Sequence, residues 1–268
     1  MHNYTHAIMG ITDALPEEDL EEHNREINFE DLRIEVHGYK RVLRELNIQI
    51  VEFVSTGLIR DKLDIEQLAV ICQGTAVIPK QPSTMGTMNG KILRKTFLEC
   101  GLNVITQDPY NPAKLSPPDV LFTGREFFVG ISEFTNEAGA HMIAETFPEY
   151  PCTPVKMNIG SLALKRYITV VGDDVLSVCD DATGQELIRK IEREASFSYK
   201  TLTIPSISAS NCVYVNNTLL HKGIEDIGDD CFKVFCDKID FPRRSLKFTE
   251  MSKLGMGPSS LVLLTRLN

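Results

Sequence analysis

The segment DVLFTGREFFVGISEFTNEAGAHMIAETFPEYPCTPVKM, residues 119–157, contains the structural unit from which the whole chain is built. It begins with two β-rich runs around Gly-Arg-Glu at 124–126, a pattern that predicts a β-hairpin. Residues 136–147 follow with apolar side chains three and four positions apart, which predicts a helix. The run TPVKM at 153–157 then predicts a further strand. The unit is therefore hairpin, helix, strand.

The same order of elements recurs along the chain. Three more hairpins are predicted in LAVICQGTAVIPK from residue 68, YITVVGDDVLSVCD from 167 and NCVYVNNTLLHK from 211. Helical spacing is found in HGYKRVLRELN (37–47), NGKILRKTFLECGLN (89–103), GQELIRKIEREA (184–195) and around CFKVFCDKI (231–239). A short strand is predicted after each helix, in IQIVEF (48–53), VITQ (104–107), TLTIP (201–205) and SLKFTEM (245–251).

The spacing of the hairpins predicts a repeat architecture. Successive hairpins begin roughly 45–50 residues apart, a period typical of propellers. Five helix-to-strand junctions are visible but only four hairpins, and the fifth can form from the chain ends, SSLVLLTR at 259–266 with HAIMGI at 6–11. An open α/β sheet would give a similar alternation, but parallel sheets do not normally carry a hairpin in every unit. We therefore expect a closed, five-fold pseudosymmetric α/β propeller of ββαβ units, in one domain spanning 1–268.

Composition limits the classes of partner. The formal net charge of −9 and the scattered Lys and Arg residues argue against nucleic acid, which attracts basic patches. No apolar stretch approaches the ~20 residues that cross a bilayer, and the N-terminus lacks the pattern of a secretory leader, so we expect a cytoplasmic protein without membrane contact. The seven cysteines are dispersed and form no CxxC pair, which predicts reduced thiols and neither a metal nor another cofactor.

Several segments resemble the dimethylarginine dimethylaminohydrolase family. PPDVLFTGREFFVGISEFTNEAGAHMIAETF at 117–147 is similar to the family at nearly every position, and shorter similarities lie at 66–78, 210–216, 219–221 and 249–255. The resemblance follows the whole chain in order and implies the pentein fold of the guanidine-modifying enzymes. It also implies hydrolysis of N-methylated arginine to citrulline and a methylamine, by a cysteine nucleophile and a histidine acid and base. Acidic side chains would hold the guanidinium, and arginines the carboxylate.

The positions that carry this chemistry have changed. In GMGPSSLVLLTRLN at 255–268, Ser259 or Ser260 takes the place of the nucleophilic cysteine, and the last cysteine of the chain is Cys236. In SLALKR at 161–166, Ala163 takes the place of the histidine. A serine hydroxyl is a far weaker nucleophile than a thiolate unless a base takes its proton, and alanine transfers no proton. The resemblance therefore implies that both halves of the reaction are lost.

The ligand-holding positions are partly kept. The family's Asp-Gly-Gly-Asp motif is Ser116-Pro117-Pro118-Asp119 here, so Ser116 replaces the site aspartate and two prolines remove backbone donors. Three acidic positions of the family fall on Asp61, Glu66 and Gln67, of which the last is neutral. Arg125 matches the arginine that holds the carboxylate, although a structural role in its loop fits the residue equally. Gly86, in STMGT at 83–87, lies nearest to the other family arginine.

The chain's histidines match none of the family's catalytic positions: His2, His6, His23, His37, His141 and His221. The favoured interpretation is a catalytically inactive scaffold that binds an arginine-like small molecule or a protein partner, as a monomer or dimer. A second interpretation is an active hydrolase of methylated arginine or a related compound, with a rearranged mechanism that uses Ser259 or Ser260 and a different acid, for which Glu66 is the candidate. A third is recruitment of a stable fold for a structural role.

Overall fold

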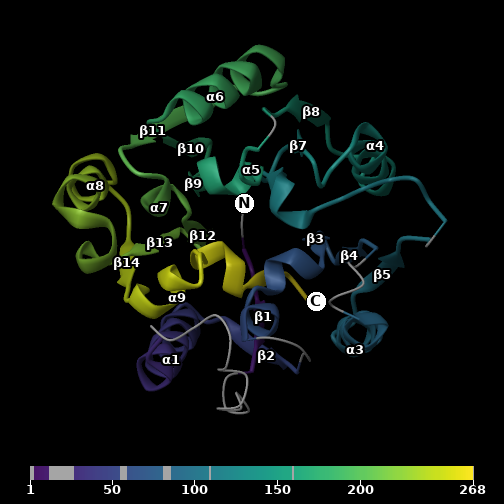
Figure 1. Cartoon of the computed structure of the whole chain (residues 1–268), viewed down its shortest axis with the longest axis horizontal. Helices are drawn as coiled ribbons and strands as arrows, with labels where there is room; N and C mark the ends of the chain where they lie inside the picture. Colours follow the sequence, from purple (N-terminus) through teal and green to yellow (C-terminus); the bar gives the residue numbers. More distant parts are fainter. Residues whose placement is uncertain are drawn as a thin grey trace.

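Five three-stranded sheets surround a central axis in the computed structural model, which describes residues 3–11, 27–54, 59–80, 86–108, 110–158 and 160–267 (Figure 1). In each sheet the middle strand pairs antiparallel with one neighbour and parallel with the other. The parallel pair is joined through a helix, which gives the ββαβ unit that the sequence predicts. The expected five-fold α/β propeller is therefore confirmed.

The strands come in the predicted order. The first sheet combines β15 (Leu263–Thr265), β1 (His6–Gly10) and β2 (Gln49–Phe53). The next two are β3 (Val70–Cys72), β4 (Thr75–Ile78), β5 (Asn103–Thr106), and β6 (Val120–Phe122), β7 (Phe127–Ile131), β8 (Cys152–Lys156). The last two are β9 (Ile168–Gly172), β10 (Val175–Cys179), β11 (Lys200–Ile204), and β12 (Val213–Val215), β13 (Thr218–Lys222), β14 (Arg243–Leu246).

The two ends of the chain close the ring. β1 pairs antiparallel with β15, with Ala7 opposite Leu264, and parallel with β2, with Ala7 opposite Ile50. The unit that begins with the C-terminal strand is thus completed by the N-terminal segment, as the sequence predicts. Closure in this way places the N-terminal strand β1 in the middle of its sheet, paired on both sides, and gives the C-terminal strand β15 a partner.

Five longer helices cover the outside of the ring, and short helices lie nearer its centre (Figure 1). The outer helices are α1 (Phe29–Glu45), α3 (Gly86–Glu99), α4 (Glu137–Thr146), α6 (Ala182–Glu194) and α8 (Ile224–Lys238). The inner ones are α5 (Leu164–Tyr167), α7 (Ile207–Ser210) and α9 (Thr249–Lys253). Side-chain caps begin several outer helices: the Asn136 side chain accepts from Gly139 N–H, and the Asp181 side chain from Gly184 N–H. Every helix within the described ranges is too short or too polar to cross a membrane.

One predicted strand is shorter than expected. Of SLKFTEM, only the first two residues lie in β14, whereas Thr249 to Met251 begin the helix α9. The buried Glu35 carboxylate explains the change, because it accepts hydrogen bonds from Glu250 N–H and Met251 N–H at the start of this helix. A negative charge at a helix N-terminus satisfies donors that the helix itself leaves unpaired. Such a cap comes from a residue more than 200 positions away, which local sequence pattern does not reveal.

Candidate functional site

A cavity of about 880 Å³ lies where the inner loops of several units meet. Its lining comes from the 3₁₀ helix Ile65–Leu68 and the residue before it, the loops before β6 and after β7, the residues leading into α5, and the segment around Gly255 and Ser260. This volume is in the usual range for small-molecule sites. Segments far apart in the sequence thus form one concave site.

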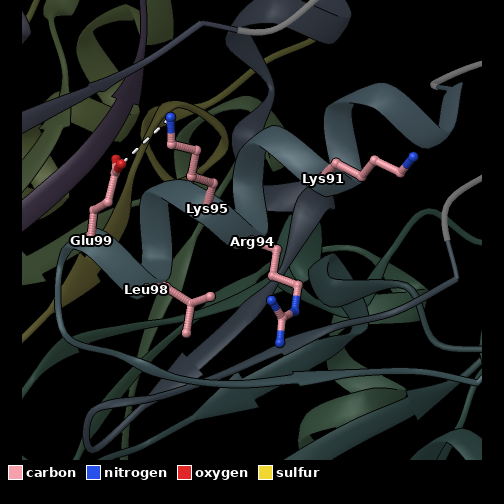
Figure 2. Close-up of a pocket in the computed structure, with 5 residues that line it drawn as sticks. All are labelled: Lys91, Arg94, Lys95, Leu98 and Glu99. Carbon is pink, nitrogen blue, oxygen red and sulfur yellow. Dashed lines mark ion pairs between the residues drawn. The ribbon is translucent and has the colours of Figure 1, made fainter.

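A second hollow, of about 540 Å³, lies on the outside of α3 and has a different character. Figure 2 shows its lining residues, Lys91, Arg94, Lys95, Leu98 and Glu99, all from that one helix. Lys95 Nζ lies 3.6 Å from Glu99 Oε1, and Lys91 and Arg94 point in different directions (Figure 2). Because these cations do not converge on one point, the larger cavity is the candidate site.

Glu66 is at the centre of a polar network beside the larger cavity. Its buried carboxylate receives Lys165 Nζ at 2.7 Å on Oε1 and the Ser259 hydroxyl at 3.0 Å on Oε2. Asn211 fixes Ser259 from the other side, since Asn211 Nδ2 donates to Ser259 Oγ at 2.8 Å and Ser259 N–H donates to Asn211 Oδ1 at 3.0 Å. Both oxygens of Glu66 are therefore engaged by groups of the chain itself.

The positions at which the resemblance places the family's catalytic residues lie at the same cavity. Ser260 and Ala163 both line it, as does Ser116, whose N–H donates to Thr135 Oγ1 at 2.9 Å. Ser260 is buried, and its hydroxyl accepts from Gly257 N–H at 3.4 Å. Ala163 is the N-cap residue of α5, immediately before Leu164. The fold thus brings together the sequence-predicted positions around Ser260, Ala163, Ser116, Glu66 and Gln67. Among the residues that the structure describes, neither a histidine nor a cysteine lines the cavity.

Asp119, the last residue of Ser-Pro-Pro-Asp, supports one wall of this cavity from behind. It is fully buried, and its Oδ2 accepts from the hydroxyls of Ser132 and Thr135, each at 2.7 Å. Its Oδ1 accepts from Leu164 N–H at 3.0 Å, next to Ala163. Burial raises the pKa of this carboxyl, and the three hydrogen bonds and Lys165 oppose the rise. Asp119 joins the loop before β6, the loop after β7 and the start of α5.

Asp64 is a site residue that the sequence analysis did not select. It lines the cavity, is 5 % exposed, and accepts from Gln67 Nε2 at 2.7 Å on Oδ2. Its other oxygen, Oδ1, is buried and has no hydrogen-bond partner among the described residues. Burial, and next the nearby Glu66 carboxylate, raise the pKa of Asp64 to about 7. The only signal in the sequence is an acidic residue between two apolar ones, Leu63 and Ile65. Both of these side chains are buried in the structure.

Other candidates lie apart from this cavity. Asp61 is in the short helix α2 (Ile59–Leu63) and Arg125 is in the turn between β6 and β7, and neither lines the cavity. Arg125 Nη1 instead lies 2.9 Å from Asp174 Oδ1, and its guanidinium lies over the Phe197 ring. Gly86 is the first residue of α3, whereas Ser83 to Met85 fall outside the described residues.

The described histidines and cysteines form no cluster suited to metal binding. His221 is buried, stacks on Phe235 with ring centroids 4.4 Å apart, and places Nδ1 2.8 Å from Lys222 O. His141 is exposed and lies 3.4 Å from Glu145 Oε1. All seven cysteines are free thiols, and burial raises the pKa of six of them, Cys72, Cys100, Cys152, Cys179, Cys212 and Cys231.

Solved structures of known proteins define the fold. The chain is 16 % identical to a cysteine-to-serine mutant of the dimethylarginine dimethylaminohydrolase of Pseudomonas aeruginosa, in complex with citrulline, with a TM-score of 0.75 over 98 % of this chain and 99 % of that one. It is 15 % identical to the N-terminal domain of ArgZ, a cyanobacterial arginine dihydrolase, with a TM-score of 0.78 over 98 % of each chain. An amidinotransferase of Microseira wollei, SxtG, gives 12 % identity and a TM-score of 0.75 over 100 % of this chain and 95 % of that one. The fold is therefore the pentein propeller.

Curated relatives narrow the class to one family, although no protein-family model matches the chain. A human protein named "Putative hydrolase DDAH2" is 31 % identical over 206 residues, which cover 73 % of this chain and 70 % of the relative. The bovine protein of the same name is 28 % identical over 267 residues, 95 % of this chain and 88 % of the relative. The chain belongs to the dimethylarginine dimethylaminohydrolase family.

Proposed function

We propose that this chain is a catalytically inactive member of the family that retains the cavity as a binding site. The observation that carries the proposal is the lining itself, which contains Ser260 and Ala163. The resemblance places the nucleophile at Ser259 or Ser260 and the proton-transferring histidine at Ala163. Hydrolysis at a guanidinium carbon requires both an attacking group and a proton for the leaving amine. The ligand is a small molecule, arginine-like or otherwise, or a segment of a partner protein, and the proposed location is the cytoplasm.

The ion pair of Glu66 further supports the loss of guanidinium chemistry. In the family, acidic side chains hold the substrate cation, but here Lys165 Nζ already lies 2.7 Å from Glu66. The neighbouring Gln67 is neutral and donates to Asp64. A substrate guanidinium would have to displace a lysine that belongs to the chain, so the cation-holding part of the site is already occupied.

A serine-based hydrolase is the second candidate, and one contact favours it. Ser259 Oγ donates to Glu66 Oε2 at 3.0 Å, which is within the range of a nucleophile and its base. Against it, Glu66 is also ion-paired with Lys165, and Ser259 Oγ accepts from Asn211 Nδ2. The contacts of Ser259 on both sides are those of a structural hydroxyl that holds three segments together.

The decisive assay is citrulline release from asymmetric dimethylarginine, monomethylarginine and arginine by the purified full chain. We expect none above the blank. The variants Ser259→Ala and Ser260→Ala separate the two candidates, because turnover that disappears in either variant would establish the serine-based hydrolase and overturn the proposal.

Restoring the family residues tests how far the cavity has diverged. We expect that Ser259→Cys or Ser260→Cys, each combined with Ala163→His, will not give an enzyme with family-like rates, because reacting groups must sit about 3–3.5 Å apart in an aligned pose. The Lys165–Glu66 ion pair and the Pro117–Pro118 loop remain in such a variant. Citrulline release would be measured after circular dichroism confirms folding. A rate close to that of an active family member would show that only two residues separate this chain from the enzyme.

A further inference from the structure

We propose that the cavity binds a small organic carboxylate with an apolar body, and that Asp64 donates the hydrogen bond by which the carboxylate is recognised. This inference rests on the proposed binding function and concerns the class of ligand. It assigns a ligand opposite in charge to the guanidinium that the family hydrolyses.

The unsatisfied oxygen of Asp64 is the first observation. Asp64 lines the cavity and is almost wholly buried, and Gln67 Nε2 satisfies Oδ2 at 2.7 Å, whereas Oδ1 has no partner among the described residues. A buried polar atom without a partner costs about 1–3 kcal/mol, so such atoms in native proteins usually have a role. A ligand group in the cavity would supply the missing hydrogen bond.

The charged groups around Asp64 affect whether its carboxyl group is protonated. Arg60, from α2, lies 3.9 Å from Asp64 Oδ2, Glu66 follows on the 3₁₀ helix, and Arg166 faces the site from α5. Burial and Glu66 outweigh the two arginines and raise the pKa of Asp64 to about 7. Near neutral pH a large share of Asp64 is therefore the neutral acid, whose hydroxyl is a donor and requires an acceptor.

The rest of the lining has an excess of positive charge. The cationic side chains are those of Arg60, Lys80, Lys114 and Arg166. The acids, besides Asp64, are Glu66 and Glu133, and the Glu66 charge is already balanced by Lys165. With Asp64 neutral, the field in the cavity attracts an anion. An acceptor that carries negative charge satisfies both the field and the Asp64 hydroxyl, since charge-assisted hydrogen bonds are the stronger kind.

The remainder of the lining is largely apolar and defines the body of the ligand. Its apolar members are Pro79, Ala113, Leu115, Pro117, Pro118, Phe134, Leu162 and Ala163. Phe134 and Leu162 are 67 % and 50 % exposed, so a ligand that covers them removes apolar surface from water. A carboxylate on an aryl or alkyl chain combines the two features that the cavity offers.

Linkage gives this proposal a characteristic pH dependence. A carboxylate that accepts from Asp64 binds only the protonated acid, so its affinity falls as pH rises through the pKa near 7. A carboxylate probe that requires the protonated form should bind about tenfold more weakly at pH 8 than at pH 6. An ammonium ligand held by the charged form would show the reverse trend.

Matched probes test the proposal on the full chain. Isothermal titration calorimetry at pH 6 and pH 8 would compare phenylacetate, phenylpropionate and phenylbutyrate with the amines of the same length, all of which keep their charge over this range. We expect at least one carboxylate to bind and to weaken about tenfold at pH 8, and the amines to bind less tightly at both pH values.

The variant Asp64→Asn isolates the residue. Its amide keeps a donor for the ligand and an acceptor for Gln67 but does not titrate, so the carboxylate affinity should become independent of pH. Arg60→Gln, a substitution on the cavity lining, should weaken carboxylate binding several-fold. Arg94→Gln removes another exposed arginine, from the α3 hollow of Figure 2, and should leave carboxylate binding unchanged.

Tighter binding of the amines, affinity that rises with pH, or a pH dependence that persists in Asp64→Asn would overturn the inference and leave the proposed binding function in place. Binding of neither probe series would also overturn it. Citrulline release in the assay above would instead overturn the proposed function, whatever the result for the probes.

Discussion

Two buried aspartates, Asp64 in the cavity lining and Asp119 behind it, have opposite surroundings. Asp119 accepts three hydrogen bonds, from two hydroxyls and the Leu164 N–H, and its oxygens are both satisfied. Asp64 accepts one, and its Oδ1 is buried without a partner among the described residues. Burial raises the pKa of both carboxyls, but only that of Asp119 is countered by three donors.

The difference distinguishes a residue that holds the scaffold together from one that is available to a ligand in the cavity. Asp119 belongs to the scaffold, because it joins three loops that hold the propeller's inner surface. Asp64 belongs to the cavity lining, and its Oδ1 lacks a hydrogen bond that a ligand could supply. Residues such as Asp119 hold the fold together, whereas the proposed change in chemistry concerns the cavity around Ala163, Ser260 and the Lys165–Glu66 pair.

The largest loss of stability is expected from removing the Asp119 carboxylate, whose oxygens both accept hydrogen bonds. Asp119→Ala leaves the donors of Ser132, Thr135 and Leu164 without their acceptor, and each buried donor left unpaired costs about 1–3 kcal/mol. We expect the free energy of unfolding to fall by about 4 kcal/mol in urea titrations at pH 7. Ser132→Ala, which removes one of the three bonds, should cost about 1 kcal/mol. A loss below 1 kcal/mol for Asp119→Ala would show that this corner is not held by the carboxylate.

Replacing Asp64, whose Oδ1 has no partner among the described residues, should instead raise the free energy of unfolding. Its pKa is about 7 in the folded chain against about 4 in an unfolded one. Between these values only the unfolded chain has lost the proton, so stability falls as pH rises through this window and remains reduced above it. Asp64→Asn should therefore stabilise the chain by as much as about 4 kcal/mol at pH 8 and by less at pH 5. Urea titrations at both pH values would measure this, and a variant less stable than the parent at pH 8 would contradict the account.

Arg125 provides the smallest expected change. Its ion pair with Asp174 is half exposed on both sides, and such pairs contribute about 0–1 kcal/mol. Arg125→Ala should alter stability within that range and leave carboxylate binding unchanged, because Arg125 does not line the cavity. Weakened binding of phenylpropionate in this variant would instead give Arg125 the ligand-holding role that the resemblance implies.

The repeat and its closure could be predicted from sequence because they depend on local pattern. Alternating β-rich runs, turn residues and helical spacing mark each unit, and the apolar run at 259–266 indicates the pairing with 6–11 that the β1–β15 register confirms. Where a residue distant in sequence determines the local structure, the local sequence pattern gives the wrong prediction. Glu35 caps α9 and converts the end of a predicted strand into helix.

The resemblance also selected Ala163, Ser116 and Ser260, which all line the cavity, whereas Asp61 and Arg125, which it selected too, do not line it. Asp64 and Lys165 could not be found in this way. Their importance comes from burial and from contacts across the ring, such as Lys165 with Glu66, a pair separated by 99 residues. A lysine and an aspartate look like surface residues in the sequence until the fold shows that Asp64 is buried and that Lys165 is paired with Glu66.

Proton uptake on binding tests the role of Asp64 most directly. Calorimetry with phenylpropionate at pH 7, in buffers of different ionisation enthalpy, counts the protons that the complex takes up. The account predicts uptake of about half a proton by the parent chain, because Asp64 is about half protonated at its pKa and fully protonated in the complex. Asp64→Asn should take up none. Equal uptake by the two proteins, or release of protons by the parent chain, would contradict the claim that Asp64 waits in the cavity for an anionic ligand.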